Sequence, residues 1–90
     1  METDTESGEQ TVERLADTVG AGWLRSTKTE LYNMKKWRVA EVIDAARERI
    51  AEGVDASMMR ILEVIIDYSI SRVGADTVAV REKVKQDARW

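Results

Sequence analysis

The sequence predicts a mainly helical protein in which a short strand precedes two core helices. Apolar side chains recur every three or four residues over residues 39–50 and 58–73, which is the spacing of amphipathic helices. Gly53 lies between the two patterns, and glycine is a common helix terminator. An all-α helical bundle is the alternative prediction, because periodicity does not decide between strand and helix over residues 23–36.

Three segments are expected along the chain. They are an acidic arm, disordered or holding a short helix, at residues 1–22, a core at residues 23–74, and an extra C-terminal helix at residues 75–90. Within the arm, Ser7 and Gln10 have the spacing of a capping box, which predicts a short helix from about residue 11 to residue 19. Apart from Met1, residues 1–10 hold no large apolar group and are expected to be disordered.

The composition argues against catalysis. The 90 residues include no cysteine and no histidine, so a thiolate nucleophile, an imidazole base and a Cys/His zinc site are all excluded. The remaining Lys, Tyr, Ser and carboxylate groups form no recognisable catalytic motif. We therefore expect neither enzymatic activity nor a cofactor or metal. The acidic start and the lack of a bilayer-spanning apolar run predict a cytoplasmic protein with no membrane partner.

The net charge of −3 conceals a segregated pattern. Residues 1–24 hold six acids and one base, whereas residues 25–38 hold five bases and one acid. Such a local basic block can form a nucleic-acid footprint even in an acidic protein. The cluster of Lys35, Lys36 and Arg38 is expected either to neutralise phosphates or to form a solvated helix surface balanced by neighbouring glutamates.

Three aromatic residues, Trp23, Tyr32 and Trp37, lie among the bases of this block. Aromatic side chains between cations can stack on single-stranded nucleic acid. In a small domain they more commonly cover the core. The sequence leaves both interpretations open.

The second core helix is apolar around more than half of its circumference, so it must be covered from two sides. A chain of this size buries little surface, which predicts a homodimer or higher homo-oligomer with this helix at the interface. The residues expected at that interface are Tyr32, Met34, Ile43, Ala46, Ile50, Met59, Leu62 and Ile66.

Residues 41–48 and 53–59 (EVIDAARE and GVDASMM) resemble the ribbon-helix-helix repressors of phages, plasmids and prokaryotic chromosomes. The resemblance extends over about residues 29–70. It implies a dimer in which one N-terminal strand from each chain forms an antiparallel ribbon that enters the major groove of DNA. The strand would comprise Thr29 to Lys35, and a phosphate would be anchored near Ser57 at the start of the second helix.

Alternation along such a strand would direct Tyr32 and Met34 toward the core and the intervening side chains toward the bases. Asparagine pairs with adenine and lysine with guanine, whereas leucine can only contact a thymine methyl group. The resemblance therefore implies the DNA-contacting set Thr29, Leu31, Asn33, Lys35, Lys36 and Ser57.

Two functions are expected from these observations. The first is a sequence-specific DNA-binding transcriptional regulator, acting as a dimeric repressor on duplex DNA. The alternative is an all-helical oligomerisation or adaptor protein, for example a viral assembly or packaging component, that does not read DNA. The acidic arm or the C-terminal helix would offer a site for a protein partner. The conformation of residues 29–35 separates the two functions.

Overall fold

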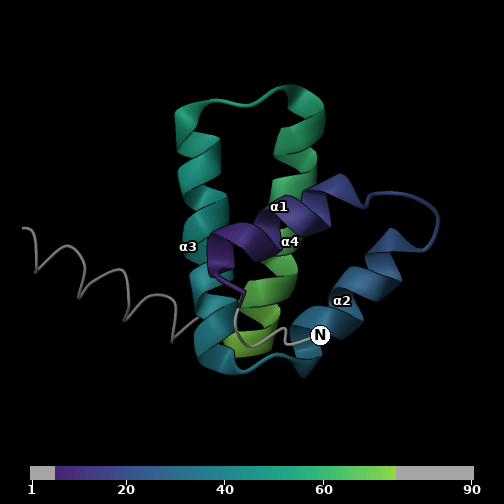
Figure 1. Ribbon diagram of the computed structural model, residues 1–90, viewed down its shortest axis with the longest axis vertical. Coiled ribbons are helices and arrows are strands. Elements are labelled where there is room, and N and C mark those ends of the chain that lie inside the picture. The colour runs from purple at the N-terminus through teal and green to yellow at the C-terminus, as the bar shows by residue number, and fades with distance from the viewer. Residues whose placement is uncertain (1–5, 75–90) are drawn as a thin grey trace, which may run out of the picture.

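The computed structural model describes residues 6–74, and every regular element in that range is an α-helix (Figure 1). The helices are α1 (Gly8–Asp17), α2 (Trp23–Asn33), α3 (Lys36–Glu52) and α4 (Ala56–Val73). α3 and α4 form an antiparallel hairpin, α1 crosses this hairpin, and α2 runs beside α4 (Figure 1). The prediction of a mainly helical protein is confirmed, while the expected C-terminal helix at residues 75–90 lies outside the described range.

The strand predicted over residues 29–35 is wrong. Residues 29–33 form the last part of α2, and the next two residues connect it to α3. α2 buries Trp23, Thr27 and Leu31, which are four residues apart and therefore lie on one face of a helix. Leu31 is fully buried in a core built from all four helices. Burial of this face outweighs the strand preference of the threonine and tyrosine side chains.

The capping box predicted at the start of α1 is confirmed. The backbone N–H of Gln10 donates to Ser7 Oγ at 3.1 Å, and the backbone N–H of Ser7 donates to Gln10 Oε1 at 2.9 Å. The helix begins at Gly8, so residues 8–10 are helical rather than disordered. Burial of Val12 and Leu15 against the core provides the free energy that orders this part of the arm.

α4 is covered largely by its own chain. Its fully inward residues, Leu62, Ile65, Ser69 and Val73, are buried. α3 packs along the length of α4, and α1 and α2 also contact it. A second chain is therefore not required to bury this face, because the helices preceding the hairpin cover it.

The residues assigned to a dimer interface are accordingly divided. Ile43, Ala46 and Leu62 are at most 2% exposed and belong to the core of the single chain, which corrects their assignment. Those that keep some exposure are Tyr32, Met34, Ile50, Met59 and Ile66. No helix within residues 6–74 has both the length and the apolar character needed to cross a membrane.

The hydroxyl of Thr27 is buried in α2 and has no hydrogen-bond partner among the described residues. Because a buried unpaired hydroxyl costs about 1–3 kcal/mol, the isosteric substitution Thr27→Val should increase the free energy of unfolding by about 1 kcal/mol. Urea unfolding measures this change. Thr29→Val is the matched control, since Thr29 is exposed on the same helix, and an equal gain in both variants would contradict the explanation.

The start of α1 lies very close to α3. A Cβ atom at Gly8 would lie 2.6 Å from the backbone oxygen of Glu41, so only glycine fits. We expect Gly8→Ala to destabilise the protein, although alanine favours a helix by about 1 kcal/mol over glycine. Thermal unfolding followed by circular dichroism tests the prediction. A stabilised Gly8→Ala variant would show that α1 does not dock on α3 in this way.

Candidate functional site

Exposed basic and aromatic residues lie at and near the turn between α2 and α3, and we refer to this group as the elbow. It comprises Lys28, Tyr32, Asn33, Lys35, Lys36 and Trp37, all of which are exposed. Trp37 is 56% exposed and Tyr32 is 40% exposed, which is unusual for side chains of this size in a small bundle. Sequence analysis placed Tyr32, Asn33 and Lys35 in a strand and named Asn33, Lys35 and Lys36 as DNA contacts.

The elbow is fixed to the end of α4 by polar contacts. Arg72 donates from Nε to the carbonyl oxygen of Tyr32 (3.0 Å) and from Nη2 to that of Met34 (3.1 Å). A cation at this position satisfies carbonyl groups that the end of α2 leaves unpaired and interacts favourably with the helix dipole. The hydroxyl of Tyr32 hydrogen-bonds Ser71 Oγ at 2.7 Å. Tyr32 is thus held at its hydroxyl end, while the residue stays 40% exposed.

The charges at the start of α3 are unfavourable for the helix itself. Lys35 occupies the N-cap position without a side-chain cap, Lys36 follows it, and the first turn contains no acid. Cations near the positive end of a helix dipole typically cost about 0.3–1 kcal/mol each. Neither ammonium group has an ion-pair partner within residues 6–74. Both ammonium groups are therefore exposed without a direct ion pair to the described part of the chain.

Arg38 does not belong to this exposed cluster, which corrects the sequence-based grouping. Its side chain is 2% exposed, and Nη2 donates to Thr11 Oγ1 at 3.2 Å and lies 4.0 Å from Glu6 Oε1. The guanidinium group is turned toward α1, because Thr11 belongs to that helix and Glu6 lies just before its N-cap. Only the two lysines remain available to an anionic partner at the start of α3.

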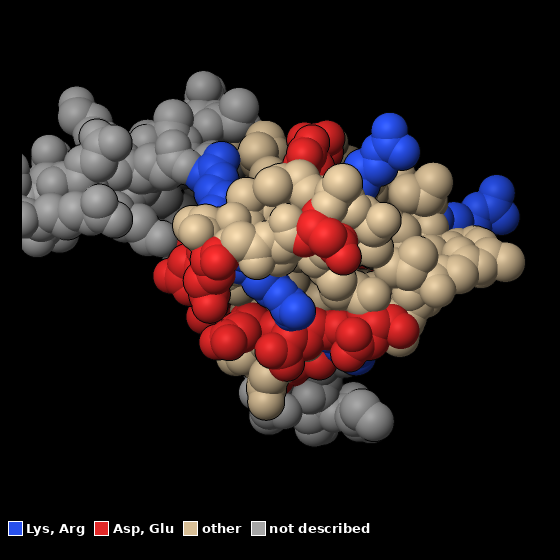
Figure 2. Space-filling view, turned by 90° about the horizontal axis from the view of Figure 1, so that it is seen from above, with Lys and Arg blue, Asp and Glu red and all other residues tan. Residues whose placement is uncertain are grey.

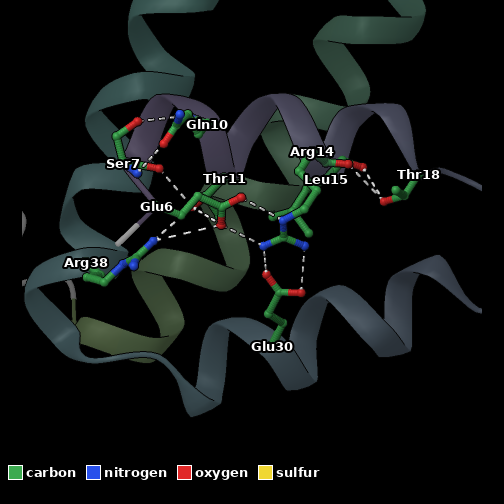
Figure 3. Close-up of polar contacts among 9 residues, drawn as sticks. All are labelled: Glu6, Ser7, Gln10, Thr11, Arg14, Leu15, Thr18, Glu30 and Arg38. Carbon is green, nitrogen blue, oxygen red and sulfur yellow. Dashed lines mark hydrogen bonds and ion pairs between the residues drawn. The ribbon is translucent and has the colours of Figure 1, made fainter. Parts of the chain in front are cut away.

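A network of ion pairs joins α1 to α2 and to the segment before α1 (Figure 3). Arg14 donates from Nε to Glu6 Oε2 (2.9 Å) and from Nη1 to Glu30 Oε1 (3.0 Å), with further Nη2 contacts to both carboxylates. Thr11 Oγ1 also donates to Glu6 at 2.9 Å. Hydrogen bonding by Arg14 lowers the pKa of Glu6, and the two carboxylates together raise the pKa of Arg14.

This network was missed by sequence analysis. Its members lie eight and sixteen residues apart, so no local pattern links them. It has one direct consequence for the elbow. Glu30 is the only acid within the basic block, and its carboxylate is directed to Arg14 rather than to the lysines.

The structure places the predicted DNA-contacting residues on different elements. Thr29 and Asn33 are exposed one turn apart on α2, and Lys35 and Lys36 are exposed at the start of α3. Leu31 is fully buried, so its proposed contact with a thymine methyl group is wrong. The helical period directs it inward, whereas the predicted strand alternation directed it outward.

Ser57 is exposed in the first turn of α4, and that end of α4 lies at the other end of the hairpin from the α2–α3 turn (Figure 1). The cap of α4 is Asp55, whose carboxylate accepts a hydrogen bond from the backbone N–H of Met58 at 2.8 Å. An acid at this helix start occupies the position in which the resemblance implied a phosphate. The phosphate anchor at Ser57 therefore has no structural support.

A second charged feature is an open hollow of about 240 Å³ between α1 and α3. It is lined by Glu9, Glu13, Ala45, Glu48, Arg49 and Glu52. Figure 2 views the molecule from the end that holds the α3–α4 turn. It shows acidic side chains gathered along one edge, with a basic side chain among them. Arg49 lies 4.0 Å from Glu13 and offsets part of the charge. No cluster of acids within residues 6–74 is arranged to hold a metal ion.

The lowered pKa of Glu6 predicts a pH-dependent contribution to stability. The ionised carboxylate stabilises the fold above about pH 4.5, its ordinary pKa, and this contribution is lost as the pH falls through the lower pKa of the folded state. Glu6→Gln should therefore cost about 1 kcal/mol at neutral pH and less at pH 3. Urea unfolding at both pH values measures the difference.

Glu63→Gln, at an exposed position on α4, is the control for loss of one carboxylate. An equal cost for Glu6→Gln at both pH values would contradict the assigned role of the ionised group.

Comparison with known proteins found no relative of this chain. The chain matches no protein-family model, no curated protein and no solved structure. Functional inference consequently depends on the chemistry of the surface. Its main features are the elbow at one end of the hairpin and the acidic hollow between α1 and α3.

Proposed function

We propose that this chain is an all-helical oligomerisation or adaptor protein that acts by binding rather than by catalysis. The proposal is favoured over a ribbon-based repressor because residues 29–33 are helical, which leaves no strand there to pair with a second chain. A protein of this kind needs an apolar surface for its partner and a folded core that does not depend on that surface.

The observation that carries the proposal is an apolar stripe along one flank of α4. Met59, Ile66 and Ile70 lie seven and four residues apart, a spacing that places them on the same side of the helix. They remain only half-buried after α1, α2 and α3 have packed. Ile66 and Ile70 touch the two core clusters from outside, so the stripe extends the core to the surface.

A second copy of the chain is the partner that suits this stripe best. A two-fold axis requires only one self-complementary surface, and a half-buried helix stripe can pack against its own symmetry mate. The acids next to the stripe, Glu63 and Asp67, are exposed and would remain in the polar rim of such an interface. The elbow and the acidic hollow involve other residues and would be left for further partners.

Sedimentation equilibrium tests this proposal. We expect the wild-type chain to dimerise with a dissociation constant of about 10 µM or below, a value common for modest interfaces. Met59→Lys should weaken dimerisation at least about tenfold, because it places a charge within the apolar stripe. Circular dichroism should show that the variant keeps its helical fold.

Ser57→Lys is the matched control, since it adds the same charge at an exposed position on the same helix. A wild-type chain that is folded and monomeric at about 100 µM would contradict the proposal, since a modest interface should already be formed at that concentration. Equal weakening by both substitutions would also contradict the assigned surface.

A further inference from the structure

We infer that the elbow is a binding site for single-stranded nucleic acid. In this assignment, Trp37 and Tyr32 stack on bases while Lys35 and Lys36 contact phosphates. The inference goes beyond the proposed oligomerisation, because it concerns a different surface and a different class of partner.

The first step concerns the aromatic side chains. Trp23 is 8% exposed, and its Nε1 donates to the carbonyl oxygen of Leu15 at 2.7 Å, so this indole belongs to the core. Trp37 is 56% exposed, and Tyr32 is 40% exposed. The structure therefore separates two alternatives that the sequence left open, with one aromatic in the core and two on the surface. Exposed aromatic rings near cations are the usual platforms for unpaired bases.

The second step concerns charge. Glu30, the only acid within the basic block, is paired with Arg14 of α1. Lys35 and Lys36 have no ion-pair partner within residues 6–74, and they lie at the positive end of the α3 dipole. The lysines, the helix dipole and the free amides of the first turn all favour a phosphate at this position.

The third step distinguishes nucleic acid from an acidic protein. An acidic peptide would engage the lysines and leave both rings without a contact, whereas a single strand supplies phosphates and base faces together. The ring of Tyr32 is already fixed by its hydrogen bond to Ser71, and Lys28 Nζ lies 5.8 Å from its centroid. A fixed ring loses little conformational entropy when a base stacks on it.

The test uses the full-length chain and fluorescein-labelled oligothymidine and oligouridine of about 20 nucleotides, long enough for one compact binding site. Fluorescence anisotropy measures the affinity across a salt series. We expect binding that weakens as salt rises, because phosphate contacts release counterions. Binding of either strand supports the inference, and comparison of the two shows whether the sugar contributes.

Lys36→Glu separates binding from folding. An acid at the first position of α3 is favourable to the helix, so the melting temperature should be unchanged or higher. The affinity for both strands should fall roughly tenfold or more, and the salt dependence should decrease. Arg60→Glu changes the net charge equally at an exposed position on α4 and should have little effect.

Trp37→Ala tests stacking. The affinity should fall roughly 5-fold to 150-fold, the range found when one stacked aromatic is removed. Leu24→Ala is the matched control, because Leu24 is 55% exposed and is likewise the second residue of its helix. The melting temperatures of both variants should remain close to that of the wild type.

Three results would overturn the inference. The first is the absence of binding to either strand at about 50 mM salt, where phosphate contacts are strong. The second is an equal loss of affinity for Lys36→Glu and Arg60→Glu. The third is an unchanged affinity for Trp37→Ala. If polyglutamate displaces the strand and Trp37→Ala has no effect, the elbow is a docking site for an acidic protein. Failure of dimerisation in the Met59 experiment would not affect these measurements, since the assays follow different surfaces.

Discussion

The apolar surface of α4 is the constraint on which the rest of this structure depends. Its inward stripe runs from Leu62 to Val73 and is too wide for α3 alone to cover. α1 and α2 cover the rest of the stripe, and a glycine at the start of each helix allows them to do so. Gly22 adopts a left-handed conformation (φ 78°) at the start of α2, and Gly8 lets α1 approach the backbone of α3. A flank of α4 remains half-buried, which is why oligomerisation is the function favoured here.

Two groups of charged residues can be distinguished, those that hold helices together and those that remain exposed without an ion-pair partner in the described part of the chain. Arg14 bonds Glu30 and Arg38 bonds Thr11, and these contacts hold α1 against α2 and α3 (Figure 3). Their charge is therefore used in holding the helices together. Lys35 and Lys36 have no such role and lie where the helix dipole disfavours them. Residues whose charge opposes local stability are reasonable candidates for function, and this argument singles out the elbow independently of its aromatic rings.

Features set by neighbours in the chain were predictable. The capping box of α1 and the stop at Gly53 each depend on residues within one turn. The two core helices were likewise predicted from a strong apolar period. The contacts of Arg14 and Arg72 were not predictable, because their partners lie up to 40 residues away. The prediction of a strand over residues 29–35 was wrong because the local pattern fitted both a strand and a helix.

The sequence by itself determined that this is a helical protein without cysteine or histidine chemistry, and it located a basic aromatic segment before the core hairpin. Composition and periodicity carry that information directly. Only the tertiary structure decided that the segment is helical, that Leu31 and Arg38 are buried, and that Trp37 is exposed. The physical reason is that two long-range interactions decide the conformation of the segment. They are the packing of Leu31 into the core and the ion pair between Glu30 and Arg14. Their free energy selects one of two conformations that local preferences leave nearly equal.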